Sequence, residues 1–135
     1  MEFSRQDIDT LSRTIWGEAR GEGEEGMLAV AHVIVNRANR GGWWGSTVHE
    51  VCRKDWQFSV WNENDPNRSK LEALDLEDVV ARECHWAALT VALGKHADNT
   101  EGSFHYHTHG VSPDWSVGLR PVRWIGNHLF FNNVE

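Results

Sequence analysis

The sequence is poor in several features, and each shortage argues against a class of protein. No stretch approaches the about eighteen consecutive apolar residues of a membrane-spanning helix, so we expect no transmembrane segment. Basic residues are in the minority, with 13 Lys and Arg against 20 Asp and Glu and a formal net charge of -7. No basic run is interleaved with aromatic residues, and the charge therefore argues against nucleic acid as a partner.

Cysteine is also scarce. Cys52 and Cys84 are the two cysteines, and they form no C-x-x-C pattern. This spacing disfavours a structural zinc site or a thioredoxin-type redox site. We expect two buried thiols, with a disulfide as the alternative.

The chain has the length of one domain. Its 135 residues contain no repeat, low-complexity tract or linker, so we predict a single catalytic domain over residues 1–135. The first residues lack the basic and apolar regions of a signal peptide, which predicts synthesis in the cytoplasm. The sequence does not indicate an oligomeric state.

Tryptophan is abundant, with eight copies against one tyrosine. Most of them belong in the core of so short a chain, and the remainder can stack on sugar rings. Trp43 and Trp44, set among glycines, are candidates for the lip of a binding groove, although one of them can equally be buried.

Hydrophobic periodicity predicts helices over residues 5–20, 24–39 and 76–93, with a further short helix after Thr47. Large and polar side chains alternate over residues 56–61, which predicts an extended segment with Gln57 and Ser59 on one face. The last third shows loops and short strands. The expected fold class is α+β and predominantly α-helical, a single domain with a small β element in the C-terminal half.

Glu18 is the acid with the clearest chemical potential. It follows Leu11 and Ile15 at helical spacing, at the border of the apolar face of the first predicted helix. A carboxyl held against apolar surface has a raised pKa, as a general acid near neutral pH requires. The alternative is a surface ion pair of Glu18 with Arg20 or Arg13.

Four segments occur together in order: residues 15–22 with 26–37, residues 57–61, residues 98–103 leading to Tyr106 and His107, and residues 125–130. Together they resemble the SleB/CwlJ-type cell wall hydrolases, a family of spore cortex-lytic enzymes and phage or prophage lysins. The resemblance implies a lysozyme-like fold and lytic transglycosylase activity on peptidoglycan glycan strands. It also implies Glu18 as the catalytic residue, with Glu22 as the alternative, and no cofactor or metal.

A lytic transglycosylase needs one carboxyl group, whereas a glycosidase normally needs two. Asp98, Asp55 and Glu22 are the candidates for a second carboxyl, and each has an alternative as a loop cap, an ion-pair partner or a solvated turn residue. The side chains expected to bind substrate, or alternatively to hold turns and strands, are Gln57, Ser59, Asp98, Thr100, Tyr106, His107 and His128.

Two other functions compete with this prediction. His105, His107 and His109 alternate along a predicted strand and, with Asp114 nearby, suggest a zinc-dependent peptidoglycan peptidase. No H-E-x-x-H segment supports it. A non-enzymatic sugar-binding module is the third possibility, and the helical periodicity argues against its usual β-sandwich.

The compact chain, without an evident export signal or wall-binding module, resembles an endolysin made in the cytoplasm and released to the cell wall by a holin. The family's spore enzymes usually carry such additions. We therefore predict a phage or prophage role, acting on the wall in the periplasm.

Overall fold

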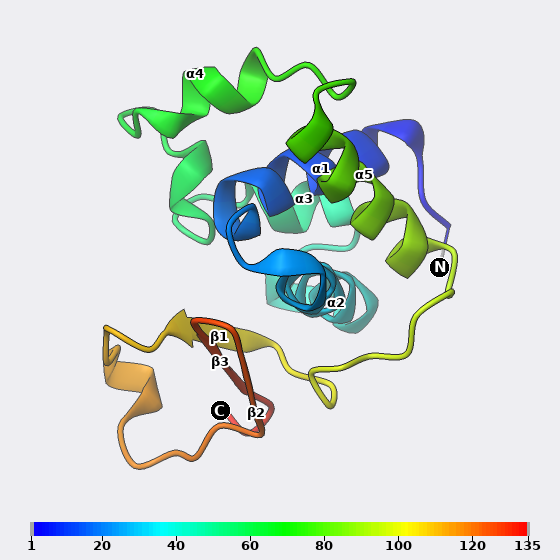
Figure 1. Cartoon of the computed structure of the whole chain (residues 1–135). Coiled ribbons are helices and arrows are strands. Elements are labelled where there is room, and N and C mark those ends of the chain that lie inside the picture. The colour runs from blue at the N-terminus through cyan, green and yellow to red at the C-terminus, as the bar shows by residue number, and fades with distance from the viewer. Residues whose placement is uncertain (1, 135) are drawn as a thin grey trace.

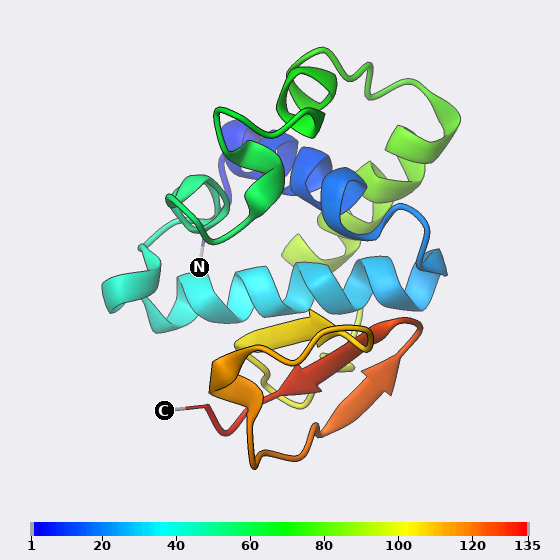
Figure 2. The ribbon, with the colours of Figure 1, turned by 90° about the vertical axis from the view of Figure 1, so that its left-hand side faces the viewer.

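The structure, a computed structural model, describes residues 2–134. These residues form five helices and a three-stranded sheet. The other four helices lie on one side of α2, and the sheet lies on the opposite side (Figures 1 and 2). The helices are α1 (Arg5–Ala19), α2 (Gly23–Arg40), α3 (Val48–Arg53), α4 (Asn67–Glu72) and α5 (Val79–Ala92). The strands are β1 (His105–Thr108), β2 (Arg123–Ile125) and β3 (His128–Phe131), and short 3-10 turns occupy Gly42–Trp44, Ser59–Trp61 and Asp114–Ser116. The predicted fold class is confirmed.

Helix α1 forms where its capping and periodicity predict. The Ser4 hydroxyl accepts a hydrogen bond from the Asp7 amide, and the Asp7 carboxylate accepts one from the Ser4 amide. Leu11 and Ile15 are fully buried, so the apolar face identified from the sequence is the face that packs. Glu18 lies in the last turn of this helix.

Helix α2 is buried on two opposite sides, as its wide apolar stripe suggests. Val30 and Ile34 belong to the core shared with the other helices, whereas Ala29 and Val33 pack with Ile125 and Phe130 of the sheet. Figure 2 shows α2 running between the helices above and the sheet below. The helix thereby fixes the position of the sheet relative to α1.

The sheet is antiparallel with the order β1-β3-β2. Tyr106 pairs with Phe130, and His107 with Leu129. Because side chains alternate along a strand, Tyr106 and Phe130 face α2 while His107 lies on the opposite face.

The predicted extended segment over residues 56–61 is wrong. The chain turns at Lys54, whose carbonyl accepts from the Gln57 amide, and a 3-10 turn follows over Ser59–Trp61. Phe58, Val60 and Trp61 are all buried, so burial does not follow the strict alternation of a strand with one polar face.

Two further differences concern the middle of the chain. The third long helix begins at Val79 rather than at 76, because residues 75–78 form a turn in which the Asp78 amide donates to the Asp75 carbonyl. Helix α4 was not predicted, since its six residues bury only Leu71 and leave no periodic signal.

Both cysteines are free and buried, as expected. Burial raises the pKa of each thiol to about 12, so both stay protonated at neutral pH. No helix within residues 2–134 combines the length and hydropathy needed to cross a bilayer.

Candidate active site

Glu18 lines an open groove of about 400 Å³ at the end of α1. The turn between α1 and α2 forms one side of this Glu18 groove, and the ends of β1 and β3 form the other. Its lining consists of Gly17, Glu18, Ala19, Arg20, Gly21, Glu22, Thr108, Asn127 and His128. The acid is thus reachable by a polymer that lies along the surface.

Tyr106 holds the Glu18 carboxyl group. Its hydroxyl donates a hydrogen bond of 2.5 Å to Glu18 Oε1. The Tyr106 ring packs against Phe130 and His128, with ring centroids 5.6 and 4.9 Å away. Burial and the neighbouring Glu18 carboxylate raise the pKa of Tyr106 well above its usual value, so its hydroxyl remains a donor.

Burial raises the pKa of Glu18 above its ordinary value of 4.5. The Tyr106 hydrogen bond and the positive charge of Arg37 oppose this rise without cancelling it, and the negative charge of Asp65 adds to it. A carboxyl group in this environment carries a proton at higher pH than a free one, as a general acid must.

Sequence reasoning missed Arg37. Its side chain is buried in α2, where Nε donates a 2.7 Å hydrogen bond to the Phe104 carbonyl. The guanidinium carbon lies 4.2 Å from the centroid of the Trp44 ring and 5.3 Å from that of Phe58. Nη1 is buried without a hydrogen-bond partner, and burial lowers the pKa of Arg37 to about 10. Its position three and four residues after Ile34 and Val33, within the apolar stripe, is the signal that could have found it.

Asp65 was also missed. It lies between the Ser59–Trp61 turn and α4, and its Oδ1 accepts a hydrogen bond from the Asn67 amide. Its negative charge contributes to the raised pKa of Glu18.

Glu22, the alternative acid, joins two elements. Its Oε1 accepts from the Asn127 amide at 2.9 Å and its Oε2 from Asn127 Nδ2 at 2.8 Å. His128 Nδ1 lies 3.3 Å from the same Oε1. At Gly126, which has a φ of 59°, a Cβ would sit 3.3 Å from Oε1, so the hairpin turn closes tightly over the carboxylate. We name this arrangement the Glu22 clasp.

His128 is buried within the clasp and against Tyr106. Burial lowers the pKa of His128, although the Glu22 carboxylate opposes this. The residue forms part of the wall of the Glu18 groove.

Asp98 and Thr100 form a loop cap. Asp98 Oδ1 accepts from the amide and the hydroxyl of Thr100, and Oδ2 accepts from Asn36 Nδ2 and the Gly102 amide. Burial alone would raise the pKa of Asp98, but these hydrogen bonds outweigh it and the pKa is lowered. Thr100 is fully buried. Neither residue lines the Glu18 groove, and both are engaged in the way that a loop role predicts.

Gln57 and Ser59 lie on the segment beside the acid. Val60 packs on Gly17, where a Cβ would come within 3.0 Å of the valine methyls. Trp61 Nε1 donates to Thr14 Oγ1 at 2.9 Å, so the same segment is anchored along α1. Ser59 is exposed and Gln57 half-buried, so both side chains are accessible, although neither lines the Glu18 groove.

The predicted convergence of three histidines is wrong. His105 packs between Trp44 and Trp115, and His107 stacks on Phe131 at 5.2 Å. Strand β1 ends at Thr108, so His109 leaves the strand and lies against Trp124. Within residues 2–134 no three His, Cys, Asp or Glu side chains form a cluster that could hold a metal ion.

Residues 21–131 match the family profile described as Cell Wall Hydrolase. The chain belongs to this family. The matched region begins just after Glu18, so the choice of the acid depends on the geometry described above.

Relatives of this cell wall hydrolase include two proteins named spore cortex-lytic enzyme. The Oceanobacillus iheyensis protein is 51% identical over 135 residues, covering 95% of this chain and 42% of that protein. The Bacillus subtilis protein is 28% identical over 133 residues, covering 95% of this chain and 38% of that protein. The chain thus spans about two fifths of the length of these relatives.

Two solved structures share the fold of this cell wall hydrolase. The catalytic domain of the Bacillus cereus SleB protein superposes with a TM-score of 0.77 at 25% identity, covering 96% of this chain and 91% of that one. The catalytic domain of the germination-specific lytic transglycosylase SleB from Bacillus anthracis gives 0.74 at 25% identity, covering 95% of both chains. These similarities confirm the family that the sequence motifs indicate.

Proposed function

We propose that this cell wall hydrolase is a lytic transglycosylase that cuts peptidoglycan between N-acetylmuramic acid and N-acetylglucosamine, with Glu18 as its acid and base. One observation carries the proposal. Glu18 and Glu22 are the carboxylates among the described residues that line the groove, and Glu22 is bound in its clasp. A single carboxyl with a raised pKa is suited to a mechanism that needs one.

In the first step Glu18 gives its proton to the oxygen that links the two sugars. The bond between this oxygen and C1 of the muramic acid breaks, and the N-acetylglucosamine leaves as an alcohol. The acetamido group of the substrate stabilises the positive charge that develops at C1. Glu18 is now a carboxylate.

In the second step the Glu18 carboxylate takes the proton of the muramyl 6-hydroxyl as that oxygen bonds to C1. The product is a 1,6-anhydro ring, and Glu18 regains its proton, so no water is consumed. Between the steps the Tyr106 hydroxyl and the Arg37 charge stabilise the carboxylate. We expect Gln57 and Ser59, on the segment that packs on Gly17 through Val60, to hydrogen-bond the sugars.

A hydrolytic muramidase is the second candidate function, and Asp65 favours it. Its negative charge raises the pKa of Glu18, and a muramidase would use such a second carboxylate to activate water for attack at C1. The hydrolytic route would leave a reducing end in place of the anhydro ring.

Product analysis separates these reactions. Purified sacculi are digested and the soluble fragments are weighed by mass spectrometry. Anhydro ends, lighter than reducing ends by one water, support the transglycosylase. Reducing ends support the muramidase, and cut stems with intact glycan would refute both and restore the peptidase.

The biological setting is a separate proposal. The names of the relatives favour cleavage of spore cortex peptidoglycan, whereas the sequence favoured an endolysin that reaches the wall through a holin. Digestion of cortex peptidoglycan and of vegetative sacculi in parallel distinguishes these roles. Preference for cortex supports the first, and efficient lysis of vegetative sacculi supports the second.

A further inference from the structure

A second hollow, of about 560 Å³, lies on the segment that follows α3. Its lining consists of Arg53, Lys54, Asp55, Trp56, Trp61, Asn62, Glu63, Asn64 and Arg68. We name it the Trp56 hollow. The same segment packs against α1 through Val60 on Gly17 and Trp61 on Thr14, so the hollow flanks the end of α1 that carries Glu18.

Trp56 combines a strained backbone with an exposed side chain. Its backbone has a φ of 67°, which residues with a Cβ adopt at a cost, and 77% of the residue is exposed. The indole N–H makes no hydrogen bond to any described residue. A large apolar ring presented to solvent from a strained backbone contributes little to the core, which makes a ligand-binding role the better explanation.

Two cations line the same hollow as Trp56. The Arg53 guanidinium carbon lies 4.4 Å from the centroid of the Trp61 ring, and Lys54 Nζ lies 4.6 Å from that of Trp43. Neither forms an ion pair within residues 2–134, whereas Arg68 is paired with Glu72 at 3.0 Å. In a chain of net charge -7, two oriented cations without counter-ions suit an anionic ligand.

We propose that the Trp56 hollow is a substrate subsite, where a sugar ring of the peptidoglycan strand stacks on Trp56 and carboxylates of its peptide stem bind Arg53 and Lys54. The inference rests on the proposed function and extends it to the uncut part of the strand. Asn62 and Asn64, which also line the hollow, supply amide groups for sugar hydroxyl and acetamido groups.

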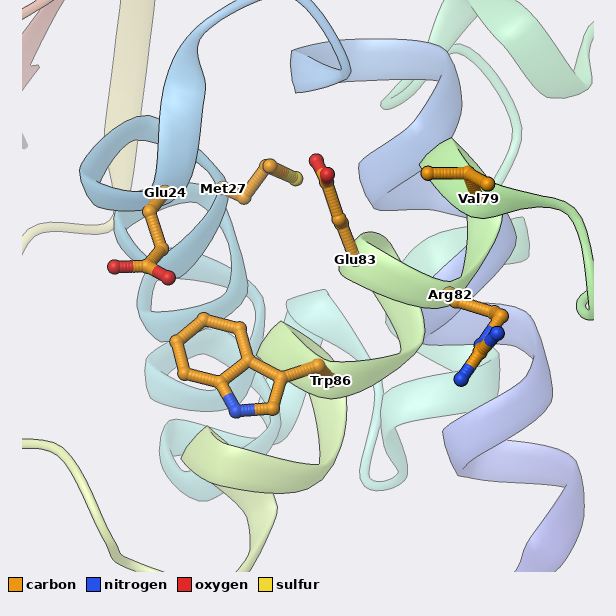
Figure 3. A pocket seen from close by; sticks show the side chains of 6 residues that line it. All are labelled: Glu24, Met27, Val79, Arg82, Glu83 and Trp86. Carbon is orange, nitrogen blue, oxygen red and sulfur yellow. The ribbon is translucent and has the colours of Figure 1, made fainter.

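A larger hollow, of about 640 Å³, lies between α2 and α5 and serves as a comparison (Figure 3). It also contains a partly exposed tryptophan, Trp86. The carboxylates of Glu24 and Glu83 border it, with Arg82 as the one cation among the described lining residues. Its charge is therefore of the wrong sign for an anionic strand, and we assign it no ligand.

The test uses the Glu18→Gln protein, which binds the strand without cutting it. Affinity is measured by calorimetry for two probes: a peptidoglycan tetrasaccharide that keeps its stems, and the neutral tetramer of N-acetylglucosamine. Trp56→Ala should weaken the binding of both by about 5-fold, because both lose the stacked ring. Trp86→Ala, the matched control, should leave both affinities unchanged.

The two cations should contribute to the binding of the stem-bearing probe only. Exchange of both Arg53 and Lys54 for Gln should weaken the stem-bearing probe by about 3-fold and leave the neutral tetramer unaffected. The difference should shrink as salt is added, because these ion pairs are exposed. An equal loss for both probes would contradict the assignment of the cations to the stem.

Trp56→Gly separates binding from folding. Glycine accepts the positive φ without strain, so this variant should melt at or above the temperature of its parent while binding as weakly as Trp56→Ala. Unchanged affinity in both Trp56 variants would overturn the subsite and leave the proposed function intact. Absence of binding by the Glu18→Gln parent, together with absence of cleavage by the unmodified protein, would overturn both.

Discussion

At the scale of single residues, the central feature is one acid, Glu18, whose pKa is raised by burial and Asp65 and lowered by Tyr106 and Arg37. Burial favours the protonated form of Glu18, while the Tyr106 hydroxyl and the Arg37 charge favour the carboxylate. A residue that acts first as acid and then as base needs both forms within reach at one pH. The balance between burial and these two partners supplies that condition.

Exchange of Glu18 for Gln should abolish most of the activity and stabilise the fold at neutral pH. We expect lysis of sacculi to fall by at least about 100-fold, because the amide cannot transfer the proton. A raised pKa in the folded state means that stability is lost as pH rises from 4.5 through the folded value. The variant should therefore melt above the unmodified protein at pH 7, and the difference should disappear below pH 4.5.

Thermal melts over this pH range and rates of lysis check both parts, with Glu83→Gln, at an exposed position of α5, as the control. Substantial lysis by the Glu18→Gln protein would rule out Glu18 as the acid.

Arg37→Met should displace the pH profile. Activity requires protonated Glu18, so it falls as pH rises through the pKa of this residue. Loss of the Arg37 charge raises that pKa further, so the falling limb of the curve of activity against pH should move to higher pH. The maximal rate should also drop, by about 10-fold, because the carboxylate formed in the first step loses its stabilising charge.

The initial rate of lysis against pH measures this shift, and two further variants calibrate it. Arg37→Lys keeps the charge and should retain a limb close to the original, whereas Asp65→Asn removes a negative charge and should move the limb to lower pH. If activity falls at the same pH in all three variants, Arg37 only fills space between Trp44 and Phe58.

How far the sequence predicts these residues depends on whether their partners are local. The position of Glu18 at the edge of an apolar face could be predicted because Leu11 and Ile15 share its helix. Tyr106 was named from its motif, but its contact with Glu18 arises only when β1 packs on α2. Arg37 and Asp65 act on the pKa of Glu18 from separate elements, and no local sequence pattern predicts that these elements pack together.

At the scale of elements, the site depends on contacts that join the turn between α1 and α2 to the sheet. The Glu22 clasp ties this turn to the hairpin between β2 and β3, because Asn127 donates two hydrogen bonds to the Glu22 carboxylate. These elements lie far apart in sequence, and together they form both sides of the Glu18 groove.

Glu22→Ala should loosen this junction without removing the acid. The loss of two hydrogen bonds to a charged group should lower the free energy of unfolding by about 2 kcal/mol. Activity should fall less than in the Glu18→Gln protein, because the proton donor remains. Urea denaturation measures the first effect and lysis the second, with Glu83→Ala as the control for loss of an exposed acid.

A greater loss of activity in Glu22→Ala than in Glu18→Gln would exchange the roles of the two glutamates. Glu22 would then be the catalytic residue, and Glu18 would have the supporting role.

The elements themselves were predicted unequally. Residues 5–20 and 24–39 form helices close to the predicted bounds, because long periodic stripes report burial directly. The prediction for residues 56–61 was wrong because an alternation of large and polar side chains resembles a strand. In the structure, Val60 and Trp61 pack against α1 from a turn. Helix α4 is too short for any period to appear.

At the scale of the whole molecule, α2 organises the fold. One of its sides builds the helical core and the other supports the sheet, so the two parts that hold Glu18 and Tyr106 share one helix. Composition and periodicity were enough to predict an α-rich domain with a small β element. They could not predict that the sheet would place its one tyrosine on the acid, since that follows from the packing of the two parts.

The central claim is that one carboxyl group cuts the strand without consuming water, and an isotope measurement tests it most directly. Sacculi are digested in water enriched in heavy oxygen, and the new muramic acid ends are examined by mass spectrometry. We predict anhydro ends that carry no heavy oxygen, because O6 of the sugar itself attacks C1. Heavy oxygen at C1 of the new ends would contradict the claim and make the enzyme a hydrolytic muramidase, with Asp65 as the first candidate for the missing base.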